Sequence, residues 1–340
     1  MKENNSPYSS AQPYDPIKKR FINPHIKDEK RTLKDAILWK MGYFNDKADL
    51  PQMPSYFSPT LPKEPAVDSS PRALWINHST FFLKIEGVHF LTDPIWGKRC
   101  SPVNFFGPIR RHSPGLELQE LGHVDHVLIS HDHYDHLDKQ TVLELHRLYP
   151  TIRWWVPLGV KKWFLNLGIM LVEELGWWES LDFTSPTDPS LQLTFTAVPT
   201  QHFSGRTIKD RWTTLWVGWV VDILGKELSK RLYFVGDTGY NEVDFKAIGQ
   251  RWPHMDLSLI PIGSYVPRKF MSPVHIDPWQ AVQIHKEVGS KQSIGMHWRT
   301  FKLSDEGAFR PPYDLSVALQ KEGINPMHFL AIPPGHEINW

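Results

Sequence analysis

The chain is expected to fold as an α/β protein in which helices cover the faces of sheets, and two observations predict this. Three short apolar runs follow one another at 73–77, 81–85 and 88–92, as paired strands do. From residue 124 onward, apolar strand patterns alternate with helical patterns. Paired strands followed by this alternation are typical of sheets covered by helices within one domain.

The later elements follow the same patterns. Apolar and β-branched clusters predict strands at 124–130, 152–156, 191–198, 215–221, 231–235, 257–262, 293–296 and 329–332. Apolar residues at helical spacing predict helices at 139–148, 160–167, 242–251, 278–288 and 315–322. No internal repeat or low-complexity tract appears in the sequence.

Residues 1–70 differ from the rest of the chain. Prolines interrupt any regular structure there, at Pro54, Pro59, Pro62 and Pro65. We therefore expect 1–70 to be an arm attached to one domain at 71–340. Within the arm, apolar and basic residues at helical spacing predict a short amphipathic helix, formed by Leu33, Ile37, Leu38 and Met41 among Lys30, Arg31, Lys34 and Lys40. This helix either docks on the domain or contacts a lipid or a partner.

Charge and cysteine content exclude several classes of protein. With 38 Lys+Arg and 37 Asp+Glu the formal net charge is +1, so no global bias towards nucleic acid is expected. Cys100 is the only cysteine, which excludes a disulfide framework and a cysteine-based zinc ribbon. Since the sequence shows no signal peptide and no membrane-spanning pattern, we expect a cytoplasmic protein that meets membranes only at their surface.

The chain contains 15 tryptophans, and some are adjacent, such as Trp154-Trp155 and Trp177-Trp178. Aromatic rings with a polar group favour interfaces between proteins or with lipid headgroups. The alternative is that they fill the core and a dimer contact.

The most distinctive segment is His131-Asp132-His133-Tyr134-Asp135-His136, which carries three imidazoles and two carboxylates. We call it the His-rich loop, because it lies between the apolar run at 126–130 and the helix expected from 139. Imidazole nitrogen and carboxylate oxygen together suit Zn²⁺, and such ligands also accept Fe²⁺ or Mn²⁺. The loop is therefore predicted to bind metal, and the alternative is a solvated loop that happens to be rich in histidine.

A pair of metal ions needs more ligands than the His-rich loop can supply. Three later residues follow strand patterns, namely His202, Asp237 and His297. Loops at one edge of a sheet can gather side chains from distant parts of the chain, which makes these residues candidate ligands. Each one is a weak signal when taken without the His-rich loop.

Together these residues match the signature of the metallo-β-lactamase superfamily, His-x-His-x-Asp-His followed by a distant His, Asp and His. The chain resembles in particular the branch of N-acyl-phosphatidylethanolamine-hydrolysing phospholipases D. The likeness runs from about residue 72 to the C-terminus. It is carried by the segments at 75–80, 91–95, 130–138, 156–159, 234–240, 260–265, 267–268, 270–271, 275–278 and 296–298.

The resemblance implies an αββα sandwich at 71–340, with two sheets packed face to face and flanked by helices. It also implies two zinc ions and a homodimer. One zinc would be held by His131, His133 and His202, and the other by Asp135, His136 and His297. Asp237 would bridge the two ions. Two further residues, His78 and Asp93, match family positions that we interpret as structural or as hydrogen-bond partners of ligands.

The resemblance implies cleavage of N-acyl-phosphatidylethanolamine-like lipids to N-acylethanolamine and phosphatidic acid. Metal-bound hydroxide would attack phosphorus while the metals neutralise charge on the non-bridging oxygens. Asp135 could also orient the nucleophile or carry its proton. His275 would protonate the leaving alkoxide, unless it only caps the helix expected from 278.

The chain departs from the family near the substrate. Asn104-Phe105 stands where the family has Gln-Tyr, and Gly205-Arg206 stands where it has Lys-Arg. We expect Asn104, Phe105, Arg206 and Tyr265 to contact substrate. Arg206 would clamp the phosphate, or else face solvent.

Other reactions are possible at such a centre, because one superfamily hosts many chemistries. A lactonase or sugar-phosphate hydrolase of the related ascorbate-lactonase branch is the alternative enzyme, and a metal-stabilised binding protein without turnover is a third class. A lipid hydrolase needs an apolar groove and a membrane-facing rim, whereas a lactonase needs a closed polar pocket. A phospholipid substrate and peripheral membrane contact are therefore expected, without nucleic acid as a partner.

Overall fold

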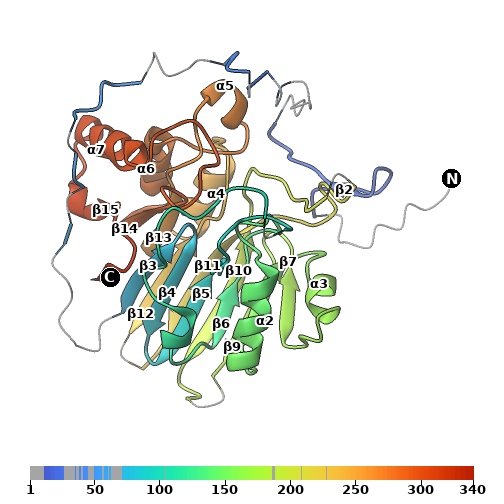
Figure 1. Cartoon of the computed structure of the whole chain (residues 1–340). Helices are drawn as coiled ribbons and strands as arrows, with labels where there is room; N and C mark the ends of the chain where they lie inside the picture. The colour runs from blue at the N-terminus through green and yellow to red at the C-terminus, as the bar shows by residue number, and fades with distance from the viewer. Residues whose placement is uncertain are drawn as a thin grey trace.

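The computed structural model describes residues 11–26, 35, 38–39, 41–44, 50–55, 57–59, 61–62, 71–103, 105–185, 188–207, 209–226 and 228–340. Within these residues, two seven-stranded sheets form the centre of the molecule (Figure 1). A separate pair of short strands belongs to the N-terminal arm.

The first sheet runs in the order β16, β3, β4, β5, β6, β7, β8. Pairing is antiparallel from β16 to β5 and parallel from β5 to β8. Its strands are β3 (Arg72–Asn77), β4 (Thr80–Ile85), β5 (Val88–Thr92), β6 (His126–Leu128), β7 (Arg153–Pro157), β8 (Val172–Leu175) and β16 (Glu337–Asn339).

The second sheet runs in the order β15, β14, β13, β12, β11, β10, β9. Pairing is antiparallel from β9 to β12 and parallel from β12 to β15. Its strands are β9 (Ser180–Thr184), β10 (Gln192–Val198), β11 (Gly218–Leu224), β12 (Ser229–Phe234), β13 (Met255–Pro261), β14 (Ser290–Met296) and β15 (Phe329–Leu330).

The inner faces of the two sheets pack on each other. Trp155 of β7 stacks on Phe195 of β10 with ring centroids 3.6 Å apart. The large core cluster contains side chains from both sheets, such as Leu83 and Phe90 with Val220 and Phe234. Trp75, Trp154, Trp155, Trp216 and Trp219 are all fully buried. These five tryptophans therefore fill the core and are not part of an interface.

Helices cover both outer faces, which completes a four-layer αββα sandwich and confirms the predicted fold class (Figure 1). The outer face of the first sheet packs against apolar residues of α2 (Lys139–Leu148) and α3 (Lys161–Leu165). The second sheet carries α4 (Asp244–Arg251), α6 (Pro278–Glu287) and α7 (Arg310–Glu322). The remaining short helices are α5 (Arg268–Met271), η2 (Leu118–Glu120) and η3 (Pro326–His328).

The structure adds elements that the sequence patterns did not predict. β8, β9 and β16 are edge strands, each paired on one side only, and β9 is mostly exposed. Such strands need few apolar residues, so their sequences carry little strand signal. α7 begins at Arg310, five residues before the predicted start, because Pro311 and Pro312 occupy its first turn, where a missing N–H costs no hydrogen bond.

The described part of the arm lies on the domain. β1 (Tyr14–Asp15) pairs with β2 (Arg20–Phe21), and Phe21 enters the core of the sandwich. The Nδ2 of Asn23 donates to the carbonyl of His202 at 2.7 Å. Most of the predicted amphipathic helix lies outside the described residues. No helix in the described ranges is both long and apolar enough to cross a bilayer.

Candidate metal centre

All seven candidate ligands lie where strands end, at one edge of the sandwich. The His-rich loop follows β6, while His202, Asp237 and His297 follow β10, β12 and β14. β10 and β12 both run antiparallel to β11, and β12 and β14 both run parallel to β13. The C-terminal ends of β10, β12 and β14 therefore point the same way, which brings these three side chains together.

The His-rich loop is held in shape from several sides. Asp93, at the end of β5, accepts hydrogen bonds from the backbone N–H of Ser130 at 2.7 Å and from its hydroxyl at 2.5 Å. Within the loop, the N–H groups of His136 and Leu137 donate to the carbonyl of His133. These contacts fix the start of the loop and a tight turn at 133–137.

The first ligand set consists of three imidazoles, His131, His133 and His202. The Nε2 of His131 lies 2.8 Å from the Nδ1 of His133, and the Nε2 of His202 lies 3.3 Å from the same Nδ1. The three ligand atoms lie within 4.8 Å of one another. We call this group the imidazole set.

The second ligand set contains a carboxylate and two imidazoles, Asp135, His136 and His297. The Oδ2 of Asp135 lies 3.4 Å from the Nε2 of His136 and 3.5 Å from the Nε2 of His297. His78 also belongs to this cluster, with its Nε2 2.9 Å from the same oxygen. We call Asp135, His136 and His297 the carboxylate set.

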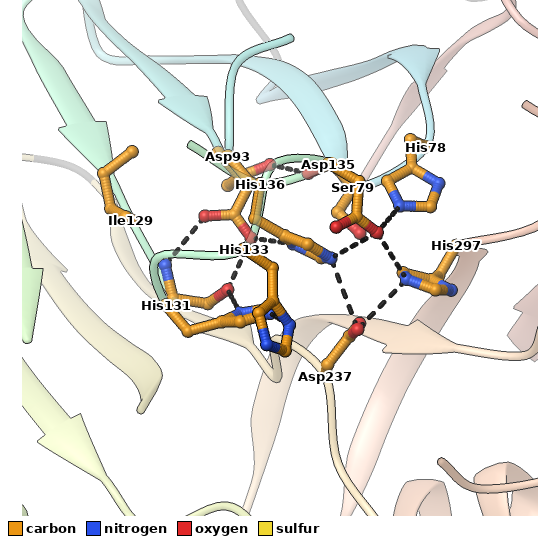
Figure 2. A network of polar contacts seen from close by, with 12 residues as sticks. His78, Ser79, Asp93, Ile129, His131, His133, Asp135, His136, Asp237 and His297 are labelled. Carbon is orange, nitrogen blue, oxygen red and sulfur yellow. Dashed lines mark hydrogen bonds and ion pairs between the residues drawn. The ribbon is translucent and has the colours of Figure 1, made fainter. Parts of the chain in front are cut away.

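Asp237 lies between the two sets (Figure 2). Its Oδ2 is 3.0 Å from the Nε2 of His297 and 3.3 Å from the Nε2 of His136. The same oxygen is 3.8 Å from the Nε2 of His202, which belongs to the imidazole set. One carboxylate thus contacts members of both sets.

Three of the candidate ligand imidazoles are oriented by hydrogen bonds at their other nitrogens. The Nδ1 of His136 lies 2.6 Å from Asp93, and the Nδ1 of His131 lies 2.9 Å from the hydroxyl of Ser130. The Nδ1 of His202 donates to the carbonyl of Val274 at 2.9 Å. These hydrogen bonds fix each of the three rings so that its Nε2 faces the centre. Metal-binding histidines commonly have such a hydrogen bond at the ring nitrogen that does not bind the metal.

Polar atoms in the centre fit a bound cation. The Nε2 atoms of His136 and His297 and the Oδ1 of Asp237 are buried and make no hydrogen bond. Buried polar atoms normally have a partner, because burial without one costs free energy. In the imidazole set, the Nδ1 of His133 lies at hydrogen-bond distance from the Nε2 of both His131 and His202, so three ring nitrogens converge on one point. The donor types and their spacing fit the binding of divalent metal.

The electrostatics of the two sets differ. Burial lowers the pKa of both His131 and His202 well below the usual value of histidine, and neighbouring imidazoles lower it further. For His297, burial acts against protonation, but Asp237 and Asp135 outweigh it and raise the pKa to about 9. The pKa of His136 is likewise raised well above its usual value, because Asp237, Asp135 and Asp93 overcome the effect of burial.

The carboxylates of the centre stay ionised. Burial acts to raise the pKa of Asp135 and of Asp237, but the neighbouring imidazoles His136 and His297 outweigh it. Both pKa values therefore lie well below the usual range of aspartate. Two carboxylates that stay ionised among buried imidazoles are anionic ligands suited to a cation.

His275 lies next to the centre and is slightly exposed. Its side chain is 15% exposed, and its Nδ1 is 3.9 Å from the Oδ2 of Asp237. Its ring lies 5.2 Å from that of His202 and 5.4 Å from that of His297. The ring is therefore close enough to the centre to contact a bound substrate, whereas the cap of α6 is supplied by the Asp277 side chain.

The residues proposed to contact substrate lie in different environments, where the structure describes them. Asn104 lies outside the described residues. Phe105 is 84% exposed on a loop. Tyr265 is wrong as a substrate contact, because it is fully buried and its hydroxyl donates to Asp314 at 2.5 Å. α7, which carries Asp314, covers this tyrosine.

Arg206 supports the His-rich loop from behind. One of its terminal nitrogens, Nη1, donates to the carbonyls of Asp132 and Leu137 at 2.8 and 2.7 Å. Its guanidinium group also lies 4.0 Å from the ring centroid of Tyr134. The structure thus gives this nitrogen a structural role in place of the predicted phosphate clamp.

Sequence patterns also missed residues that position the ligands. Gly263, just after β13, passes so close to His297 that an added Cβ would lie 2.1 Å from the His297 carbonyl oxygen. A side chain at this position would therefore displace a ligand. Val274 and Ser130 act through a carbonyl and a hydroxyl, and neither residue type signals such a role in a sequence.

Comparison with known proteins decides the family. A model of the β-lactamase superfamily domain matches residues 89–298. The chain belongs to the metallo-β-lactamase superfamily. It is 40% identical over 270 residues to N-acyl-phosphatidylethanolamine-hydrolyzing phospholipase D 1 of Caenorhabditis elegans, covering 77% of this chain and 74% of that protein. Within the superfamily it therefore belongs to the family of this worm protein and is a metal-dependent hydrolase.

Three further similar proteins share less of the sequence than the worm protein does. The mitochondrial N-acyl-phosphatidylethanolamine-hydrolyzing phospholipase D of Saccharomyces cerevisiae is 31% identical over 251 residues, covering 74% of this chain and 52% of that protein. The metallo hydrolase Igni18 from Ignicoccus hospitalis has a similar fold, with a TM-score of 0.58 at 18% identity over 80% of this chain and 98% of that one. An isothiocyanate hydrolase from Delia radicum gut bacteria gives 0.57 at 17% identity, covering 79% of this chain and 99% of that one.

Proposed function

We propose that the chain is a dizinc phosphodiesterase of the phospholipase D type. Its substrates would be N-acyl-phosphatidylethanolamine-like lipids, and its products N-acylethanolamine and phosphatidic acid. The observation that carries the proposal is the pair of ligand sets with Asp237 between them. The identity to the worm phospholipase D supports the choice of substrate.

The residues present fit zinc because imidazole nitrogens and carboxylate oxygens are both common zinc ligands. His131, His133 and His202 would hold one ion, Asp135, His136 and His297 the other, and Asp237 would contact both. Two bound zinc ions supply activation of a water molecule near neutral pH and neutralisation of charge on the phosphate oxygens.

The chain's own residues would orient the attacking water and transfer protons. Asp135 is held at its Oδ2 by the Nε2 of His78, which limits rotation of the carboxylate. In this position Asp135 can orient the attacking water and accept its proton. His275, next to the centre, can donate a proton to the oxygen of the departing N-acylethanolamine. The step breaks the bond between phosphorus and the oxygen of N-acylethanolamine. The oxygen of the attacking water takes its place on phosphorus, so the remaining lipid phosphate is phosphatidic acid.

A lipid substrate implies peripheral contact with a membrane, and we include this contact in the proposal. The resemblance to the phospholipase D family also implies a homodimer. Neither point is needed for the chemistry at the centre.

The proposal is tested by incubating the zinc-loaded protein with micelles of N-acyl-phosphatidylethanolamine and identifying the products by mass spectrometry. We expect N-acylethanolamine and phosphatidic acid in equal amounts. Asp237→Asn protein prepared in the same way is the matched control and should give neither product. Hydrolysis of a lactone without any N-acylethanolamine would overturn the proposal in favour of the ascorbate-lactonase branch.

A further inference from the structure

The N-terminal arm reaches the metal centre through Asn23. The Nδ2 of Asn23 donates to the backbone carbonyl of His202 at 2.7 Å, although the two residues are 179 positions apart in the chain. Asn23 is 8% exposed and His202 is 1% exposed, so water has little access to this hydrogen bond. A buried carbonyl needs a partner inside the protein, and Asn23 supplies it. A side chain of the arm thus holds the backbone of a candidate ligand.

The arm is anchored on both sides of Asn23. Before it, Phe21 is buried in the core of the sandwich, and its N–H donates to the carbonyl of Trp212 at 2.8 Å. After it, the Nε2 of His25 lies 3.4 Å from the Oδ1 of Asp244, the first residue of α4. Because the chain is held at both points, the Asn23 hydrogen bond costs little additional conformational entropy. Asn23 is therefore kept beside His202.

His202 lies on a different segment from the other members of the imidazole set. His131 and His133 belong to the His-rich loop, whose start and turn are fixed by bonds to backbone N–H groups. His202 instead lies on the loop that follows β10. The carbonyl of Val274 holds its ring, and Asn23 holds its backbone. These two bonds together determine where the Nε2 of His202 points.

The segment after His202 also depends on the arm. Phe203 packs edge-on against the ring of His133, with ring centroids 4.5 Å apart. The next residue, Ser204, accepts at its carbonyl from the N–H of Trp212 at 2.9 Å. The carbonyl of Trp212 in turn accepts from Phe21 of the arm. The arm therefore holds this loop at two places, beside the ligand and where the loop returns.

A second amide of the arm is equally buried but contacts no candidate ligand. Gln12 is 6% exposed and bonds to the backbone of Trp177 in both directions. Its Nε2 donates to the carbonyl at 3.1 Å, and its Oε1 accepts from the N–H at 2.8 Å. Gln12 therefore fastens the arm to the domain without holding a ligand, which makes it a natural comparison for Asn23.

We propose that Asn23 is a positioning residue of the metal centre, through which the N-terminal arm sets the metal affinity of the imidazole set. Without its hydrogen bond the peptide of His202 can rotate and carry Nε2 away from the Nδ1 of His133. The inference rests on the proposed metal-binding role of His202. Its test measures metal binding and does not depend on turnover.

The experiment measures the zinc affinity of the full chain by competition with a chromophoric chelator. Two parent variants isolate the two ligand sets, because His297→Ala removes a ligand of the carboxylate set and His133→Ala removes one of the imidazole set. Added to His297→Ala, Asn23→Ala should weaken zinc binding roughly tenfold, as loss of a hydrogen-bond partner behind a ligand commonly does. Added to His133→Ala, it should change the zinc affinity by less than about twofold.

Gln12→Ala is the matched control, since it removes a similarly buried amide from the same arm. Thermal unfolding of the metal-free proteins should show that Gln12→Ala and Asn23→Ala both lower stability. Only Asn23→Ala should lower the zinc affinity of the His297→Ala parent. With Co²⁺ in this parent, only Asn23→Ala should shift the visible absorption bands, which report the geometry of the ligands.

Asn23→Asp is the second variant, for use if Asn23→Ala does not fold. It has nearly the shape of asparagine but lacks the N–H donor, so the same loss of zinc affinity is expected.

Three results would overturn the proposal. The first is an unchanged zinc affinity when Asn23→Ala is added to His297→Ala, which would leave both ligand sets standing. The second is an equal loss in both parents or in Gln12→Ala, because the arm would then act on the whole fold. The third is a lack of zinc binding by both parents, which would overturn the proposed function as well. A selective loss with Asn23→Ala in a protein that cleaves no lipid would support the inference and count against the proposed substrate only.

Discussion

The two ligand sets of the centre face each other across Asp237 but differ in how they are prepared for metal. The imidazole set has no carboxylate of its own, and burial lowers the pKa of His131 and His202. The carboxylate set pairs its imidazoles with Asp135 and Asp237, which raise the pKa of His297 to about 9. At neutral pH the first set is therefore uncharged, and the second already holds protons.

Because of this difference, two metal ions bound as proposed would enter the two sets at different free-energy costs. An ion that enters the imidazole set would meet neutral imidazoles, because burial lowers the pKa of His131 and His202. An ion that enters the carboxylate set must displace protons from His136 and His297, because metal and proton compete for the same nitrogen. We infer that the imidazole set binds its ion more readily below pH 9, and that the carboxylate set depends more on pH.

The largest effect is expected from Asp237→Asn, since this carboxylate contacts both sets. Replacing it with an amide removes the negative charge shared by the two sets, and turnover should fall roughly 10³-fold. Metal analysis of the purified variant should show loss from both sets. Near-normal turnover with a full metal content would contradict the bridging role of Asp237.

A single substitution in each ligand set tests that set separately. His133→Ala removes a ligand of the imidazole set, and His297→Ala removes one of the carboxylate set. Each protein should retain about one metal ion and lose most of its activity. Native mass spectrometry gives the stoichiometry. If both variants kept two ions, these residues would not be ligands.

Raising the pH should act on the metal-free protein through the carboxylate set. The pKa of His297 is raised to about 9 in the folded state, against about 6.5 in an unfolded chain. A raised pKa means that its stabilisation is complete below pH 6.5 and is lost as the pH rises through about 9. The free energy of unfolding should therefore decrease over this range, by an amount on the order of 3 kcal/mol at most.

This pH effect is measured by urea unfolding in the presence of a chelator. His297→Gln protein is the control, and it should show a flatter profile between pH 6.5 and 9. A stability that stays constant or increases with pH in the wild type would contradict the assignment of protons to the carboxylate set.

The smallest effect is expected from Asp93→Asn. Asp93 lies 2.6 Å from the Nδ1 of His136 and also holds the Ser130 backbone, so its loss loosens one ligand without removing it. Activity should fall about 10-fold to 100-fold, and excess zinc should restore part of it. A fall as large as that of Asp237→Asn would mean that Asp93 acts in the centre itself.

Much of the fold and of the centre could be predicted from the sequence, because both depend on local patterns. The His-rich loop joins a buried strand to a helix, and the predicted helix at 139–148 coincides with α2. His202, Asp237 and His297 each follow an apolar strand, so strand order alone brings them to one edge. The sequence patterns did not predict the edge strands β8, β9 and β16, because these strands bury few residues.

The substrate-contacting residues could not be predicted with the same success. Tyr265 is covered by α7 through Asp314, which lies 49 residues further along the chain, and no local pattern reports that contact. Arg206 supports the carbonyls of a loop some 70 residues earlier. Both outcomes depend on how distant loops pack, whereas metal ligands are recognised by residue type and spacing.

The central claim is that seven residues form two metal sites that share Asp237. It is tested most directly by crystals of the zinc-loaded protein, measured by anomalous diffraction at the zinc absorption edge. Two peaks per chain are expected, one about 2.0–2.2 Å from the ligand atoms of His131, His133 and His202 and the other equally close to those of Asp135, His136 and His297. Asp237 should lie between them. A single peak, or two peaks without Asp237 between them, would contradict it.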